Sequence, residues 1–168
     1  SNEPKGTGVA YSVDFGDTWR FINQPIVENP VEGLYYNVEW GIDTLQILAV
    51  TTAVNNVSYD LAIGGDYIYS TSWAGGLQRF RYTDVTPQWE IIPLPMDNQS
   101  QLICDDIDID VYELNPKDPD DGGNHNHKGF SVYSYNENTI WVGTASGINK
   151  GIINPNNNCI NWVRYTSF

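Results

Sequence analysis

A polar loop at residues 118–127 carries the side chains best suited to metal chemistry. Its acids and histidines are Asp118, Asp120, Asp121, His125 and His127, with two glycines between the two groups. Closely spaced carboxylates beside a sharp turn suit a hard cation such as Ca²⁺, which takes six to eight oxygen ligands, although the spacing is not that of an EF-hand. Two histidines two positions apart suit a transition metal instead. A solvated acidic loop without an ion is the third interpretation.

Four aromatic residues are candidates for a ligand surface: Tyr35, Tyr36, Trp40 and Trp73. All four lie in or near segments that we expect to connect strands, where an aromatic ring can stack on the apolar face of a sugar. Aromatic residues in short strands also commonly pack in the core. Both interpretations, a carbohydrate platform and core packing, stay open on the sequence alone.

Residues typical of a catalytic centre are not gathered in any recognisable motif. The sequence has no nucleophile elbow, no phosphate-binding glycine loop, and no cysteine and histidine at a familiar catalytic spacing. The arginines Arg20, Arg79, Arg81 and Arg164 fall inside expected strands rather than in connecting loops. We therefore assign no catalytic residue and favour a protein that is not an enzyme, with a glycoside hydrolase of sialidase-like type as the open alternative.

The charge balance restricts the possible partners. The chain of 168 residues has 8 Lys and Arg against 21 Asp and Glu, a net charge of −13. Nucleic acid and anionic membrane surfaces require a cationic surface, so both are unexpected partners. A cation or a neutral ligand such as a carbohydrate fits better. No apolar run approaches the roughly 18 residues of a spanning helix, so no membrane insertion is expected.

Cys104 and Cys159 are the only cysteines, and their separation of 55 residues fits no metal-binding pattern. Few lysines and many Asn, Asp, Gly and Tyr residues indicate an exported protein, secreted or at the cell surface, in which the two thiols form a disulfide. The alternative is two buried free thiols.

Three segments of the chain repeat one another. Each has a glycine, a polar turn and a tryptophan followed by apolar residues. The tryptophans are Trp19, Trp89 and Trp162, spaced by 70 and 73 residues. Before the second and third segments, two further strand patterns are each closed by a turn-forming triplet, 64–66 and 136–138. One complete unit is therefore four short antiparallel strands, which we designate A to D, and the first unit has only C and D.

These segments resemble two related repeat families. Residues 12–19 match the Asp-box, Ser-x-Asp-x-Gly-x-Thr-Trp, of bacterial neuraminidase-type repeats at every defined position, and residues 139–148 are similar to the B–C hairpin of sensor propellers in bacterial two-component regulators. The resemblance implies an all-β fold with β-propeller-like blades of four antiparallel strands. It also implies roles for the matching residues. Ser12 and Asp14 would bind backbone groups across the C–D turn, Gly16 would take a positive φ, Thr18 would complete the turn, and Trp19 would pack between blades.

The domain organisation follows from the repeat. We expect a single propeller-like segment over 1–168, with a partial blade at 7–23, an inserted hairpin at 24–56, a blade at 57–95, an acidic insertion at 96–128 and a blade at 129–168. The first insertion should hold strands 34–40 and 45–50, and the second a strand at 107–112. About two and a half blades is fewer than a closed propeller contains, so we expect a partial propeller that belongs to a longer polypeptide.

The expected function is non-catalytic recognition or scaffolding in an exported bacterial surface protein. The long D-to-A insertions would bind a carbohydrate or a protein, with Ca²⁺ as a possible cofactor. One alternative is part of a sialidase-like glycoside hydrolase, which would need an arginine cluster and a tyrosine nucleophile with a carboxylate partner. The other is a structural adhesin or assembly component.

Overall fold

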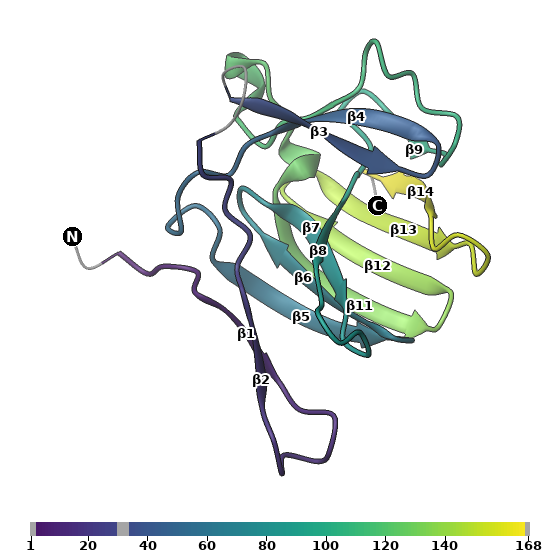
Figure 1. The fold of residues 1–168 in the computed structure, drawn as a ribbon. Helices are drawn as coiled ribbons and strands as arrows, with labels where there is room; N and C mark the ends of the chain where they lie inside the picture. Colours follow the sequence, from purple (N-terminus) through teal and green to yellow (C-terminus); the bar gives the residue numbers. More distant parts are fainter. Residues whose placement is uncertain (1–2, 30–33, 167–168) are drawn as a thin grey trace.

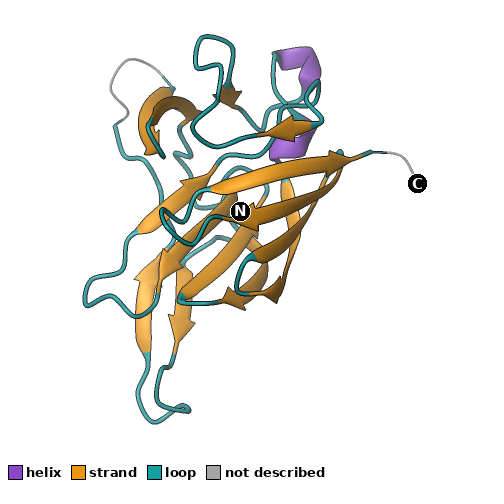
Figure 2. Cartoon of the chain, turned by 90° about the vertical axis from the view of Figure 1, so that its right-hand side faces the viewer, coloured by secondary structure: helices purple, strands orange, loops and turns teal. Residues whose placement is uncertain are grey.

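The computed structural model describes residues 3–29 and 34–166 and is built from β-strands and loops (Figure 1). The expectation of an all-β fold with antiparallel sheets is confirmed. Two short helical turns, Pro119–Asp121 and His125–His127, lie in the second insertion, outside the large sheets (Figure 2). No helix among the described residues is long and apolar enough to cross a membrane.

Two large antiparallel sheets contain the strands expected for the complete units. The first has the order β5-β6-β7-β8, and the second has β11-β12-β13-β14 with the short strand β9 added beside β14. Their bounds are β5 Ser58–Gly64, β6 Tyr67–Ser72, β7 Gly76–Arg81, β8 Trp89–Ile92, β9 Gln101–Leu102, β11 Gly129–Asn136, β12 Thr139–Thr144, β13 Gly147–Ile153 and β14 Ile160–Tyr165.

The first unit is a hairpin of β1, Gly8–Tyr11, and β2, Arg20–Asn23. Its turn is held by its own side chains, from residues 12–18. Ser12 Oγ accepts a hydrogen bond from the Gly16 amide at 2.8 Å, and Asp14 Oδ1 accepts one from the Thr18 amide at 2.8 Å. Gly16 has a φ of +94°, which a residue with a Cβ rarely adopts. Because its oxygens are already bonded within the turn, Asp14 is a structural residue here.

These bonds set the ionisation of Asp14. Hydrogen bonds from Thr18 and Ser12 favour the charged form and lower the pKa of Asp14 from 3.8 to about 2. Its contribution to stability should therefore be complete above pH 3.8 and be lost as the pH falls toward 2. We predict that the Thr18 amide resonance titrates with a midpoint near 2 in an NMR pH series. A midpoint near 3.8 would show that the turn bonds do not form in solution.

The three units share one strand register. Trp89 pairs with Phe80, which lies four residues after Gly76, the first residue of β7. Trp162 pairs with Gly151, which lies four residues after Gly147, the first residue of β13. In the first hairpin, the pairing of Tyr11 with Arg20 places Trp19 beside the residue four after Gly8. The three glycines, Gly8, Gly76 and Gly147, all have positive φ. Trp89 and Trp162 thus occupy equivalent positions in their sheets, and Trp19 lies at the corresponding position just before β2.

Their surroundings differ, which corrects part of the sequence analysis. Trp162 is fully buried, Trp89 is half-buried, and Trp19 is 67% exposed. The expectation that Trp19 packs between blades is therefore wrong. The physical reason is that no described sheet covers that side of the first hairpin.

The units stack by the same faces. Val9 and Tyr11 of the first hairpin pack against Ile68 and Phe80 of sheet β5–β8. The opposite face of that sheet packs against sheet β11–β14, in a larger core that also includes the inserted segments. Residues of this core include Tyr69, Leu77, Ile92, Val132, Ile140, Val142 and Trp162.

A second repeat, which the sequence analysis missed, lies in buried polar contacts. Asn56 donates from Nδ2 to the carbonyl oxygen of Pro25 at 2.7 Å and accepts from Ser72 Oγ at 2.6 Å. Asn126 makes the same two contacts, with Pro95 at 2.7 Å and Thr144 Oγ1 at 2.7 Å. Both asparagines are fully buried, and each follows its proline by 31 residues. Each one fastens the end of an insertion to the sheet that follows it.

The first insertion forms the hairpin of β3, Tyr35–Trp40, and β4, Asp43–Leu48. Its turn is two residues, shorter than expected, and begins at Gly41 with a φ of +63°. A Cβ at Gly41 would lie 2.1 Å from Asp105 Oδ1, so only glycine fits there. Strand β10, Glu113–Leu114, joins β4 in parallel, and Figure 1 shows this small sheet above the two large ones.

The strand expected at 107–112 is not formed. These residues make a turn in which the carbonyl oxygen of Asp108 accepts from the amides of Val111 and Tyr112 at 3.1 and 2.8 Å. Asp108 Oδ1 also accepts from the Asp110 amide at 3.3 Å. Aspartate side chains stabilise such local turns in competition with strand pairing, which explains the difference.

Candidate functional site

A pocket of about 400 Å³ lies between the β3–β4 hairpin and sheet β5–β8. The hairpin contributes Tyr36, Glu39 and Trp40, and the loop before β14 contributes Asn157 and Asn158. The facing sheet contributes Tyr67, Arg79, Trp89 and Glu90. The pocket therefore has aromatic walls and polar groups of both charges, a composition typical of sites for small ligands.

Arg79 is the central charged residue of this pocket. Its side chain is 3% exposed, and Nε donates to Glu90 Oε2 at 2.7 Å. The guanidinium lies 4.4 Å from the ring centroid of Tyr67 and 5.4 Å from that of Trp40. The ion pair and the two aromatic faces hold the buried cation in place.

Two donors in the pocket wall have no acceptor among the described residues. They are Nε1 of Trp40 and Nη1 of Arg79, both fully buried. Buried polar groups are nearly always hydrogen-bonded, and each one left unpaired is costly. These two donors lie beneath the accessible surface of the wall, so their lack of a partner is a cost to the folded protein.

The tyrosines of this region remain protonated at neutral pH. Burial raises the pKa of Tyr36 to about 12, and burial also raises the pKa of Tyr67 and of Tyr69. Neutral phenols can donate hydrogen bonds to a ligand but are poor nucleophiles. The phenols of Tyr36 and Tyr67 can therefore donate hydrogen bonds to a ligand in the pocket.

The structure separates the four aromatic residues proposed from the sequence. Tyr36 and Trp40 line the pocket. Tyr35 instead accepts at its hydroxyl from Asn115 Nδ2 at 3.0 Å. Trp73 lies at a different hollow, where its ring contacts Phe130 and the ammonium of Lys128 at 4.8 Å. The four residues do not form one platform.

The polar loop 118–127 has an internal arrangement of its own. Asp118 pairs with His125 Nε2 at 3.2 Å and with Lys128 Nζ, while Asp120 and Asp121 are exposed in the first helical turn. His127 is fully buried, accepts at Nδ1 from the Asn115 amide and donates from Nε2 to the Leu94 carbonyl oxygen, both at 3.0 Å. With both ring nitrogens bonded, His127 is unsuited to ligate a metal beside His125.

The burial of His127 gives a testable pH dependence. Burial lowers the pKa of His127 from 6.5 to about 4, because the charged ring would lose its hydration. The unfolded chain therefore binds this proton more readily, and stability should fall as the pH drops from 6.5 toward 4. We predict an NMR titration midpoint near 4 for His127. A midpoint near the ordinary value of 6.5 would contradict the buried, doubly bonded imidazole.

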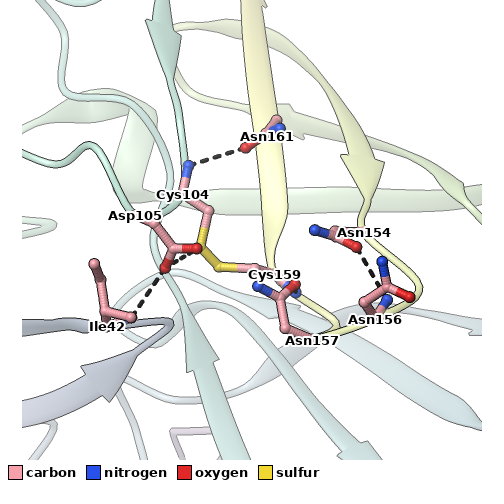
Figure 3. Close-up of a disulfide and its surroundings, with 8 residues drawn as sticks. All are labelled: Ile42, Cys104, Asp105, Asn154, Asn156, Asn157, Cys159 and Asn161. Carbon is pink, nitrogen blue, oxygen red and sulfur yellow. Dashed lines mark hydrogen bonds between the residues drawn. A yellow bond between two sulfur atoms is a disulfide. The ribbon is translucent and has the colours of Figure 1, made fainter.

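Cys104 and Cys159 form a disulfide that ties the second insertion to the start of β14 (Figure 3). The adjacent Asp105 Oδ1 accepts from the Ile42 amide at 2.9 Å, which fixes the turn of the β3–β4 hairpin. Among the described residues, the one grouping of three acidic, histidine or cysteine ligand atoms is Cys104, Asp105 and Cys159, whose sulfurs are joined. This cluster therefore positions the pocket's hairpin.

Several pocket residues were missed by the sequence analysis because they lie within repeat strands. Arg79 and Glu90 are direct cross-strand partners, as are Tyr69 and Arg79. Opposite charges at paired positions on an otherwise apolar sheet face could have indicated these pocket residues. Such pairs can be recognised only when the register between the two strands is known. The other arginines lie apart: Arg81 pairs with exposed Asp66, and Arg164 bonds the 96–99 loop.

Comparison of the chain with protein-family models, curated proteins and solved structures finds no match in any of the three.

Proposed function

We propose that the chain is a non-catalytic recognition segment with β-propeller-type architecture, and that it binds a carbohydrate in the pocket between the β3–β4 hairpin and sheet β5–β8. The observation that carries the ligand proposal is the lining of this pocket, which places the aromatic rings of Tyr36, Trp40 and Tyr67 beside the charged pair of Arg79 and Glu90. Sugars combine acceptor oxygens with apolar ring faces and match both features.

The propeller proposal is supported by the way the sheets approach one another. Their first strands, β5 and β11, lie side by side, and Asp60 Oδ2 accepts from the Val132 amide at 2.9 Å. Tyr59 also contacts Phe130, with ring centroids 5.4 Å apart. Close first strands and stacked equivalent faces are expected for blades arranged around an axis. The Asp-box contacts of Ser12 and Asp14 agree with the same proposal.

An exported location is part of this proposal. The Cys104–Cys159 disulfide would persist in an oxidising compartment and would be reduced in most cytosols. The high acidic charge suits a surface exposed outside the cell and keeps the protein soluble.

Titration calorimetry with a panel of neutral and acidic oligosaccharides tests the ligand proposal. For a sugar that binds, we predict that Tyr67→Ala weakens binding at least about tenfold, because it removes one aromatic wall and loosens Arg79. Tyr135→Ala is the matched control, since Tyr135 is 67% exposed on β11 and does not line the pocket. Equal losses in the two variants, or no sugar bound at millimolar concentration, would reject carbohydrate binding at this pocket.

A further inference from the structure

The first unit has two strands where the other units have four. Strand β1 corresponds to β7 and β13, which are each paired on both sides. Among the described residues, β1 pairs only with β2. Its other edge corresponds to the edge that β6 occupies on β7. An unpaired edge of this kind is a ready template for another strand.

An apolar groove of about 560 Å³ lies beside this edge. One side of the groove is β1, with Val9 and Tyr11, and the other side includes Leu61, Ile63 and Ile68 from β5 and β6. Leu61 is 48% exposed and Ile63 is 68% exposed. At the internal sheet interface, by contrast, the other face of β5 is covered by β11. The groove is thus the place that the first two strands of the first unit would fill.

We propose that β1 accepts an antiparallel β-hairpin along its free edge, and that this partner is a hairpin of the same repeat type as β5–β6. One strand would pair with β1 in the register in which β6 pairs with β7, which places a residue equivalent to Ser72 opposite Gly8 and one equivalent to Tyr69 opposite Tyr11. The other strand would cover Leu61 and Ile63. The added strand would repeat the pairing that β6 makes with β7. This proposal does not depend on the carbohydrate pocket.

The probe is a synthetic peptide of residues 57–72, the β5–β6 hairpin, added to the full chain. Within the molecule this hairpin both pairs with a third strand and packs its Ala62 and Tyr69 side on the next sheet. We expect saturable binding by fluorescence anisotropy, with slower amide exchange in β1 when the peptide is bound. A peptide with N-methylated amides in its second strand, which cannot complete the pairing, should bind at least about tenfold more weakly.

Ile63→Ser tests the groove and should weaken peptide binding about tenfold, because a large apolar contact is lost. Ile152→Ser is the control, since Ile152 is an isoleucine on β13 that is 45% exposed and does not line the groove, so the change should leave binding unchanged. Absence of saturable binding, or equal binding of the methylated peptide, would overturn the proposal. A dimer of the chain that closes through this groove and resists the peptide would identify a second copy as the occupant and would also overturn it.

Discussion

Replacing Asn126 by alanine should destabilise the protein by about 3 kcal/mol or more. Asn126 is fully buried and bonds the Pro95 carbonyl oxygen, the Thr144 hydroxyl and the Asn149 amide. Alanine would leave these groups unpaired in the interior, and each unpaired group costs about 1–3 kcal/mol. Urea unfolding measures the change. Asn156→Ala, at an exposed turn, is the control and should shift stability by less than about 0.5 kcal/mol.

The equivalent substitution Asn56→Ala should have a similar effect. Asn56 makes the same contacts to Pro25 and to the hydroxyl of the following sheet, Ser72 in place of Thr144. A loss comparable to that of Asn126→Ala would support the equivalence of the two units in energy as well as in geometry. A negligible loss of stability in Asn56→Ala, together with a large loss in Asn126→Ala, would show that the same contacts do not contribute equally to the stability of the two units.

Reduction of the Cys104–Cys159 disulfide is the other large expected effect. The bond spans 55 residues, and closing a loop of that length removes chain entropy from the unfolded state worth about 4 kcal/mol. We therefore predict a markedly lower thermal midpoint in reducing agent. The double variant Cys104→Ser/Cys159→Ser should show the same low midpoint with and without the agent.

The disulfide should also affect the pocket. Cys159 and the two residues before it line the pocket, and Asp105 beside Cys104 holds the Ile42 amide of the facing hairpin. Ligand binding should weaken on reduction even at temperatures where the sheets remain folded. An unchanged thermal midpoint after verified reduction of both thiols would contradict the role assigned to this bond.

Local chemistry explains which parts of the fold the sequence predicted. The strand pairs β5–β6 and β11–β12 are closed by residues that favour tight turns, and alternating apolar residues mark the strands on either side. The first hairpin was predicted for the same reason, because residues 12–18 form its turn with their own side chains. Such features require no knowledge of distant residues.

The features that the sequence did not predict depend on contacts between distant segments of the chain. The pocket joins Trp40 of one insertion to Arg79 of a repeat strand, and no local pattern relates these two residues. The strand expected at 107–112 had the right alternation, but the turn bonds of Asp108 prevailed. Asn56 and Asn126 resemble any polar loop residue until the sheets that bury them are known.

The central claim is that the sheets β5–β8 and β11–β14 are two copies of one unit, stacked by equivalent faces and continued by the first hairpin. A crystal structure of the chain tests this most directly. One rotation should carry Asn56, Gly76 and Trp89 onto Asn126, Gly147 and Trp162, and the same rotation should carry Gly8 and Trp19 onto Gly76 and Trp89. Different partners for the two buried asparagines, or two unrelated rotations, would contradict the account.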